Sequence, residues 1–204
     1  MNTILPGLIF LLFAIIFIGV GLFLIERRSF NAKDIAVIAT LASIAAVSRV
    51  PFAVIPSAQP TTFMVMISGI VFGPLLGFIV GILSAVISNM FLGQGPWTLM
   101  QMLSWGLCGL TSGFLGRLCI RRGKWFMIGF GIFWGYLFGW IMNAWYWLSF
   151  IYPLTFTSWL LTNAASFGFD TIHAVTNGIF LYLLGQDFIK VLQRFKAKLR
   201  YSVE

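Results

Sequence analysis

Long apolar segments separated by short polar stretches run through almost the whole chain. The first of them, residues 4–25, contains no charged side chain and is as long as the roughly 20 residues that a helix needs to cross a bilayer. Since 60% of the residues are hydrophobic and only 9% are charged, a water-soluble fold would lack polar residues for its surface. The sequence therefore predicts an all-α membrane protein, whose backbone polar groups are satisfied within helices.

The N-terminal apolar segment is predicted to remain in the protein as a helix. Glu26, Arg27 and Arg28 follow it, whereas a signal peptide places its basic residues before the apolar run and a small-residue cleavage site after it. We therefore expect residues 1–30 to form an extra transmembrane helix with its N-terminus outside the cell. Residues 31–204 are expected to form a compact bundle of six core transmembrane helices.

Residues 63–91 can form either one helix kinked at Pro74 or a hairpin that turns at Gly73 and Pro74. Lys and Arg collect in cytoplasmic loops, so the basic residues after the first span and those at 117–124 should share one side of the membrane. An even number of crossings must separate them, which only the hairpin provides. The expected core spans are about 34–50, 62–72, 74–91, 97–117, 125–150 and 165–189, with a cytoplasmic C-terminus.

Small residues recur along the second span, at Ala32, Ala36, Ala39, Ser43 and Ala46. Such a stripe lets another backbone approach closely, which in lipid is a main source of helix association. The residues alone leave two readings open, namely packing inside the bundle and docking of a partner subunit. Glycines repeat in the same way on three other spans and predict close helix contacts there: Gly73, Gly77, Gly81, Gly106, Gly109, Gly113, Gly116, Gly131, Gly135 and Gly139.

The larger polar side chains gather in the outer half of the predicted bundle. They are Arg49, Gln59 and Thr61 near the first outer loop, Asn89, Gln94, Trp97 and Gln101 near the second, Asn143, Tyr146 and Trp147 at the end of the fifth core span, and Asp170, His173 and Asn177 on the last. The inner half carries chiefly hydroxyl groups, which can bond to their own helix. This distribution predicts a ligand site that opens outward and is closed at its inner end.

Asp170, His173 and Asn177 have the spacing i, i+3, i+7 and so project from one face of a helix. Arg49 is the only basic residue expected on that side, and an ion pair with Asp170 would lower the cost of burying both charges. His173 is expected to be hydrogen-bonded within the bundle more often than to contact a ligand.

Amides, prolines and glycines dominate the two outer loops and suit a neutral ligand rich in amides or carbonyls. Residues 152–163 form either a lid or an aromatic belt at the interface. No catalytic residue, metal ligand or cofactor is predicted, although a membrane enzyme using Asp170 and His173 stays a less favoured alternative. The net charge of +8 lies in loops between spans, so no nucleic-acid partner is expected.

From about Ala32 onward the chain resembles the substrate-binding S-components of energy-coupling factor (ECF) transporters. The resemblance rests on the alanine-rich ATLASIAAVSR, the turn in SGIVFGPLLG, the helix end SNMFLGQGPW, and a last helix that leads to a basic tail. Within that group, SRVPFAVIPSAQPTT and NMFLGQGPWTLMQ are most similar to the cobalamin-specific members.

This resemblance implies a high-affinity vitamin-binding protein that docks onto a transmembrane T-component driven by two ATPase subunits. The ligand would be cobalamin or a related corrinoid, with another vitamin or precursor as the alternative. By the same resemblance, the docking face would comprise Ala32, Ala36, Ala39, Ala42, Ser43 and Ala46. Family members usually have six spans, so the N-terminal helix departs from the pattern.

Overall fold

The computed structural model describes residues 5–27 and 30–201, so Ile4 and Arg28 lie outside the described residues. The described part is all-helical. Its eight helices are α1 (Leu5–Glu26), α2 (Ala32–Arg49), α3 (Pro60–Phe72), α4 (Pro74–Leu92), α5 (Trp97–Phe114), α6 (Gly116–Arg122), α7 (Lys124–Phe150) and α8 (Phe156–Tyr201). The prediction of an all-α membrane protein is confirmed.

Within the described residues, three helices are long and apolar enough to cross a membrane on their own: α1, α4 and α7. A fourth span arises if α5 and α6 count as one, with a bend of 63° between them. The remaining helices pack alongside: α3 is apolar but has only 13 residues, and α2 and α8 carry more charge. Several apolar spans in one chain are typical of a multi-pass membrane protein.

The predicted hairpin between the second and third core spans is confirmed, because α3 ends at Phe72 and α4 begins at Pro74. Gly73 connects them with φ of +102°, a conformation that residues with a side chain rarely adopt. Proline suits the first position of α4, where no helical hydrogen bond needs its missing N–H. Further along, α4 packs closely on α5, where a Cβ on Gly109 would collide with the backbone of Gly77.

Two helix boundaries differ from the sequence-based prediction. The span expected to end at residue 117 breaks at Leu115, where α6 turns away. The last helix was expected to begin at residue 165 but begins at Phe156, so most of the segment 152–163 forms its first turns. Thr155 and Ser158 cap this start reciprocally, since each side-chain oxygen accepts from the backbone N–H of the other, at 3.1 and 3.0 Å.

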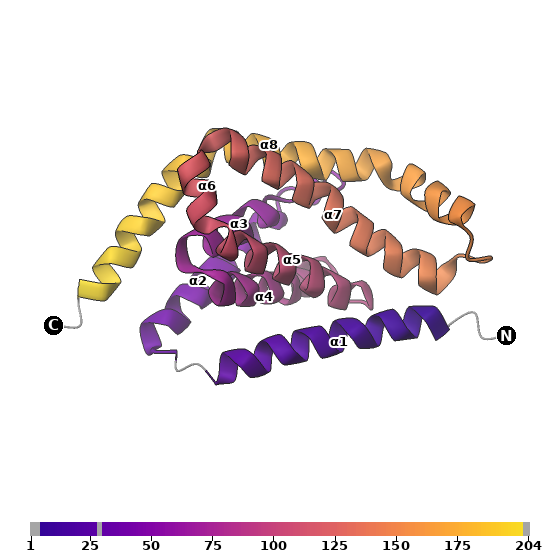
Figure 1. Ribbon diagram of the computed structural model, residues 1–204, viewed down its shortest axis with the longest axis horizontal. Helices are drawn as coiled ribbons and strands as arrows, with labels where there is room; N and C mark the ends of the chain where they lie inside the picture. The colour runs from indigo at the N-terminus through magenta and orange to yellow at the C-terminus, as the bar shows by residue number, and fades with distance from the viewer. Residues whose placement is uncertain (1–4, 28–29, 202–204) are drawn as a thin grey trace.

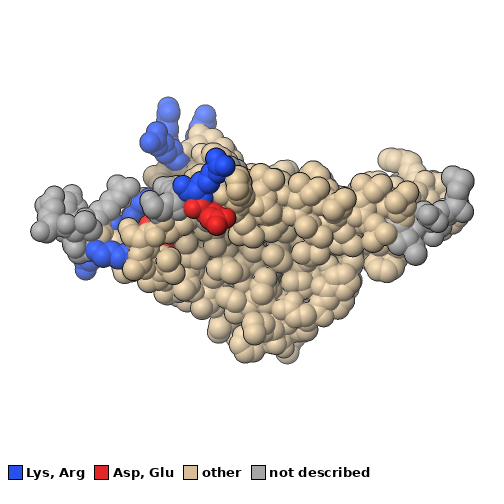
Figure 2. Space-filling view, turned by 90° about the horizontal axis from the view of Figure 1, so that it is seen from below, with Lys and Arg blue, Asp and Glu red and all other residues tan. Residues whose placement is uncertain are grey.

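Figure 1 shows α7 and α8 side by side along one edge of the molecule and α1 along the opposite edge, with α2 to α5 between them. The α7–α8 connection lies at one end of the bundle, and α6 and the end of α8 lie at the other. On the face in Figure 2, Lys and Arg gather at a single end. The polar loops and the basic residues are therefore separated along the length of the bundle.

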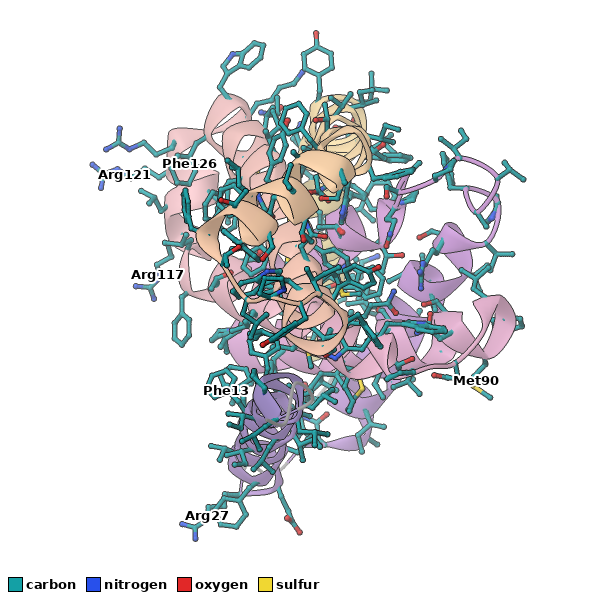
Figure 3. All side chains as sticks on the ribbon, turned by 90° about the vertical axis from the view of Figure 1, so that its right-hand side faces the viewer. Phe13, Arg27, Met90, Arg117, Arg121 and Phe126 are labelled. Carbon is teal, nitrogen blue, oxygen red and sulfur yellow. The ribbon has the colours of Figure 1, made fainter. Side chains whose placement is uncertain are left out.

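The N-terminal helix α1 packs on α7, α5 and α4 through small residues spaced seven apart, Gly7, Ala14 and Gly21. A Cβ on Gly7 would collide with Ser149, and one on Gly21 with Phe78, so α1 lies close to its neighbours at both ends. Its opposite face is apolar and exposed, and Phe13 points away from the bundle in Figure 3. In a membrane this face would contact lipid.

Candidate ligand-binding site

Arg49, the last residue of α2, binds neutral side chains of α4 rather than an acid. Its Nη1 donates to Ser88 Oγ at 3.0 Å and to Asn89 Oδ1 at 2.7 Å, and its guanidinium lies 5.3 Å from the centre of the Trp105 ring. The predicted ion pair with Asp170 is wrong, since Asp170 finds its partners on α7 and α8. Hydrogen bonds and the π face of Trp105 stabilise this partly buried charge instead.

Asn89 extends these contacts to α5. Its Nδ2 donates to Thr98 Oγ1 at 2.9 Å and to Gln101 Oε1 at 2.6 Å. The Thr98 hydroxyl in turn donates to Gln94 Oε1 at 3.0 Å, and Gln94 is exposed in the second outer loop. We call Arg49, Ser88, Asn89, Thr98 and Gln101 the Arg49 network.

Trp105 joins this network to the last helix. Its Nε1 donates to Thr62 Oγ1 at 2.9 Å, and the Thr62 hydroxyl lies 2.7 Å from His173 Nε2. The rings of Trp105 and His173 both pack on Phe138, with centroids 5.0 and 4.9 Å away. His173 is therefore buried and hydrogen-bonded inside the bundle, as the sequence favoured.

A second polar group lies between α7 and α8. Three oxygens of α8 surround Nδ2 of Asn143: Ser166 Oγ at 2.6 Å, Asn163 Oδ1 at 3.2 Å and Asp170 Oδ2 at 3.3 Å. The Ser166 hydroxyl also contacts Asp170 Oδ2 at 2.9 Å. We call Asn143, Asn163, Ser166 and Asp170 the Asp170 cluster.

Glycines of α7 make room for the polar side chains of α8. A Cβ on Gly139 would collide with the carboxylate of Asp170, and one on Gly135 with Ala174. Deeper in the bundle, Asn177 Nδ2 donates to the carbonyl of Gly131 at 3.1 Å. The glycine repeat on α7 therefore faces the buried face of α8 on which Asp170, His173 and Asn177 lie, as their spacing predicted.

A cavity of about 500 Å³ adjoins the Asp170 cluster at the end of the bundle that carries the α7–α8 connection. Its lining is mostly apolar and includes two members of the cluster: Asn143, Tyr146, Ile151, Ser158, Leu161, Thr162, Ala165, Ser166 and Phe169. Small-molecule sites typically have this size, with an apolar lining and a few polar groups that set orientation. Other cavities lie toward the basic end, among them one of about 840 Å³ beside Arg117 and Lys196.

Residues 33–193 match the family described as "ECF transporter, substrate-specific component". The chain belongs to this family. Members of this family are substrate-specific components of transporters and not enzymes. The alternative of a membrane enzyme using Asp170 and His173 falls away.

Two curated relatives match part of this S-component at low identity. A UPF0397 protein of Vibrio atlanticus is 27% identical over 99 residues, which cover 46% of this chain and 54% of the relative. A UPF0397 protein of Aliivibrio salmonicida is 29% identical over 97 residues, covering 45% and 52%. The chain spans about half the length of the curated relatives it matches. No solved structure matches it.

The small-residue stripe on α2 of this S-component divides into an exposed and a buried part. Ala32, Ala36, Ala39 and Ser43 are exposed on the surface of the bundle. Ala42 and Ala46, which the resemblance also placed on the docking face, are completely buried and pack against the bundle's own helices. The structure therefore exposes only the first set to a partner.

The structure distributes the predicted site residues of the S-component over several places. Arg49, Asn89, Gln94 and Gln101 meet at the Arg49 network, Thr61 donates to Ala45 O at 2.9 Å, and Asn143, Tyr146 and Asp170 lie at or beside the cavity. Gln59 precedes α3, Trp97 begins α5, Trp147 donates to Ser158 Oγ at 2.9 Å, and Asn177 lies deeper. These last residues join neither group.

Sequence reasoning missed neutral residues of this S-component that belong to the two groups or connect the Arg49 network to the last helix: Thr62, Ser88, Thr98, Trp105, Phe138, Asn163 and Ser166. A signal was present for two of them. Asn163 and Ser166 extend the spacing of Asp170, His173 and Asn177 along one helix face, in steps of three and four residues.

Proposed function

We propose that this S-component binds a vitamin or vitamin precursor at the outer surface of the cell membrane and delivers it to a T-component driven by two ATPase subunits. The observation that carries the proposal is the placement of a partly polar cavity at the opposite end of the bundle from the basic residues. Ligand capture at one side and ATP hydrolysis by partners at the other need this separation.

Orientation follows from the basic residues. Arg117 and Arg121 project from the α6 side in Figure 3, and the C-terminal part of α8 adds Lys190, Arg194, Lys196 and Lys198. Because cytoplasmic segments near spans are rich in Lys and Arg, this end faces the cytoplasm. The cavity and the α7–α8 connection then face outward. We infer that residues 31–204 form the transport domain and that α1 is an added helix whose N-terminus is outside.

The exposed small residues of α2 are the proposed docking face for the T-component. Ala32, Ala36, Ala39 and Ser43 leave the α2 backbone open to close approach by another helix. An apolar groove of about 230 Å³ between α2 and the end of α8 runs beside Ala36. A partner helix could therefore contact both elements toward the cytoplasmic end of the bundle.

Cobalamin is the first ligand to test, because the two outer loops resemble those of cobalamin-specific S-components. A bound corrinoid would colour the purified protein, and its binding would change the visible absorption spectrum. Colourless protein that does not respond to cobalamin would assign the site to another vitamin or precursor, for which a cavity of about 500 Å³ has a suitable size.

The function is tested by separating binding from uptake. Purified protein should bind its vitamin without partners, and cells should take the vitamin up only when the T-component and ATPases are present. Replacing the exposed Ala39 by Leu should abolish uptake and leave affinity in detergent unchanged, while Ala164→Leu, at an exposed site on α8, should leave both intact. Sustained uptake by the isolated chain in vesicles would contradict the proposal.

A further inference from the structure

Asp170 carries an acidic group into the membrane without a basic partner. Its side chain is only 8% exposed, and none of the described Lys, Arg or His residues bonds to it. Asn143 and Ser166 supply the hydrogen bonds that it does receive. Ionisable groups within membrane spans are costly, and they usually face a partner or a ligand path. In the part of the chain that the structure describes, no cationic residue balances this carboxylate.

The geometry around Asn143 shows what would fit. Oxygens of Asn163, Ser166 and Asp170 all lie within 3.3 Å of its Nδ2. An amide nitrogen has only two hydrogens, so at most two of the three acceptors receive a full hydrogen bond, whereas an ammonium group has three hydrogens. A cationic nitrogen in place of this amide would meet one oxygen with each N–H, and one of the three oxygens belongs to a carboxylate.

The adjoining cavity suits the rest of such a ligand. Asn143 and Ser166 form part of its wall, so the three oxygens lie directly behind its lining. Ile151 and Leu161 offer apolar contact, and Tyr146 and Phe169 offer aromatic rings to which a cation is attracted. A carboxylate beside aromatic rings in an apolar pocket is a combination that favours organic cations over neutral or anionic molecules.

We propose that the ligand of this S-component carries a positive charge as an ammonium group on an apolar body, and that Asp170 is its counter-charge. The cationic nitrogen displaces the Asn143 amide from the three oxygens, and the body of the ligand fills the cavity between α7 and α8. Gly139 is a positioning residue, because only a glycine leaves space for the Asp170 carboxylate. The inference rests on the proposed ligand-binding role.

Matched probes test the charge. Thermal unfolding and calorimetric titration of the purified protein would compare pyridoxamine, whose aminomethyl arm is an ammonium group, with pyridoxine, which has the same ring but a neutral hydroxymethyl arm. We expect pyridoxamine to raise the melting temperature and pyridoxine not to do so. Asp170→Asn should weaken that binding at least tenfold, whereas Asp187→Asn, at an exposed acid on the same helix, should leave it unchanged.

A second variant keeps the test decisive if Asp170→Asn disturbs folding. Tyr146 is 48% exposed, so Tyr146→Leu should fold normally and bind the cationic probe several-fold more weakly. Unchanged affinity in Tyr146→Leu, or unchanged affinity in a folded Asp170→Asn protein, would overturn the inference.

The failure of this inference and of the proposed function give different results. A neutral or anionic vitamin, such as cobalamin, could bind equally well to the wild type and to Asp170→Asn. That result would refute the inference of a cationic ligand and leave the transport role intact. If none of these compounds binds and cells show no uptake with the full transporter, both the cation and the ligand-binding role are refuted.

Discussion

The Arg49 network and the Asp170 cluster each hold one charge among neutral side chains, yet their surroundings differ. The Arg49 network lies between α2, α4 and α5, and its members bond mainly to one another. The Asp170 cluster lies between α7 and α8 alone, and two of its members line a cavity. The same residue types therefore brace the bundle in one place and border an open site in the other.

Packing explains the difference. Helices α4 and α5 touch through glycines, so their backbones approach too closely to leave space for a ligand. Helices α7 and α8 also touch at glycines, but beyond Gly139 toward the outer end their side chains line the cavity. A polar group beside close-packed backbones stabilises the fold, and one beside a cavity is available for recognition.

The largest effect on stability is expected at Trp105, at the centre of the region that the Arg49 network stabilises. Trp105 is completely buried, donates to Thr62 and packs on Phe138. Trp105→Ala should therefore lower the free energy of unfolding by about 3–5 kcal/mol, the usual cost of emptying such a site. Chemical denaturation in detergent measures it, and Trp97→Ala, at a residue exposed by 40%, is the control. A loss below about 1 kcal/mol would refute the bracing role.

Two asparagines compare the regions directly. Asn89→Ala would remove the partner of Arg49 and leave Gln101 Oε1 unpaired, so we expect a loss of about 2 kcal/mol of unfolding free energy. Asn163→Ala, at a partly exposed residue of the Asp170 cluster, should cost less than about 1 kcal/mol. Equal losses measured by the same denaturation would contradict the distinction between the Arg49 network, which stabilises the bundle, and the Asp170 cluster, which borders the cavity.

Gly139 tests whether the helix contact positions the carboxylate. Gly139→Ala would push its new Cβ into Asp170, and such overpacking costs about 1–2 kcal/mol of unfolding free energy. Binding of a cationic ligand should weaken as well, because the carboxylate moves. Gly129→Ala on the same helix has no neighbouring atom within 4 Å and serves as the matched control. Unaltered stability and binding in Gly139→Ala would show that α7 and α8 adjust freely.

Local sequence signals predicted the helices well and their partners poorly. The turn at Gly73 and Pro74 and the shared face of Asp170, His173 and Asn177 depend on backbone geometry over a few residues, which sequence determines directly. The partner of Arg49 depends on how helices far apart in the chain are placed. Opposite charge suggested Asp170, but the neutral residues of α4 lie within reach and satisfy the guanidinium.

The second feature that the sequence did not predict was which face of a helix packs against the rest of the bundle. The sequence correctly predicted a stripe of small residues on α2. It did not predict that Ala42 and Ala46 are buried while Ala36 and Ala39 are exposed. A repeat of small residues indicates that the backbone of another helix can approach closely, but it does not indicate which helix does so. The start of α8 was missed for a related reason: Thr155 and Ser158 cap the helix well before its apolar span, and the prediction followed the apolar span.

The smallest effect on stability, and the finest test of the comparison, is expected where the Arg49 network reaches the surface. Gln94 is exposed and accepts a hydrogen bond from Thr98, so Gln94→Ala should change the unfolding free energy by less than about 0.5 kcal/mol. If the second outer loop covers the ligand, losing one neutral hydrogen bond should still weaken binding by about 1 kcal/mol, roughly a fivefold increase in Kd by titration. Unchanged affinity would confine recognition to the Asp170 cluster and leave the Arg49 network a purely structural role.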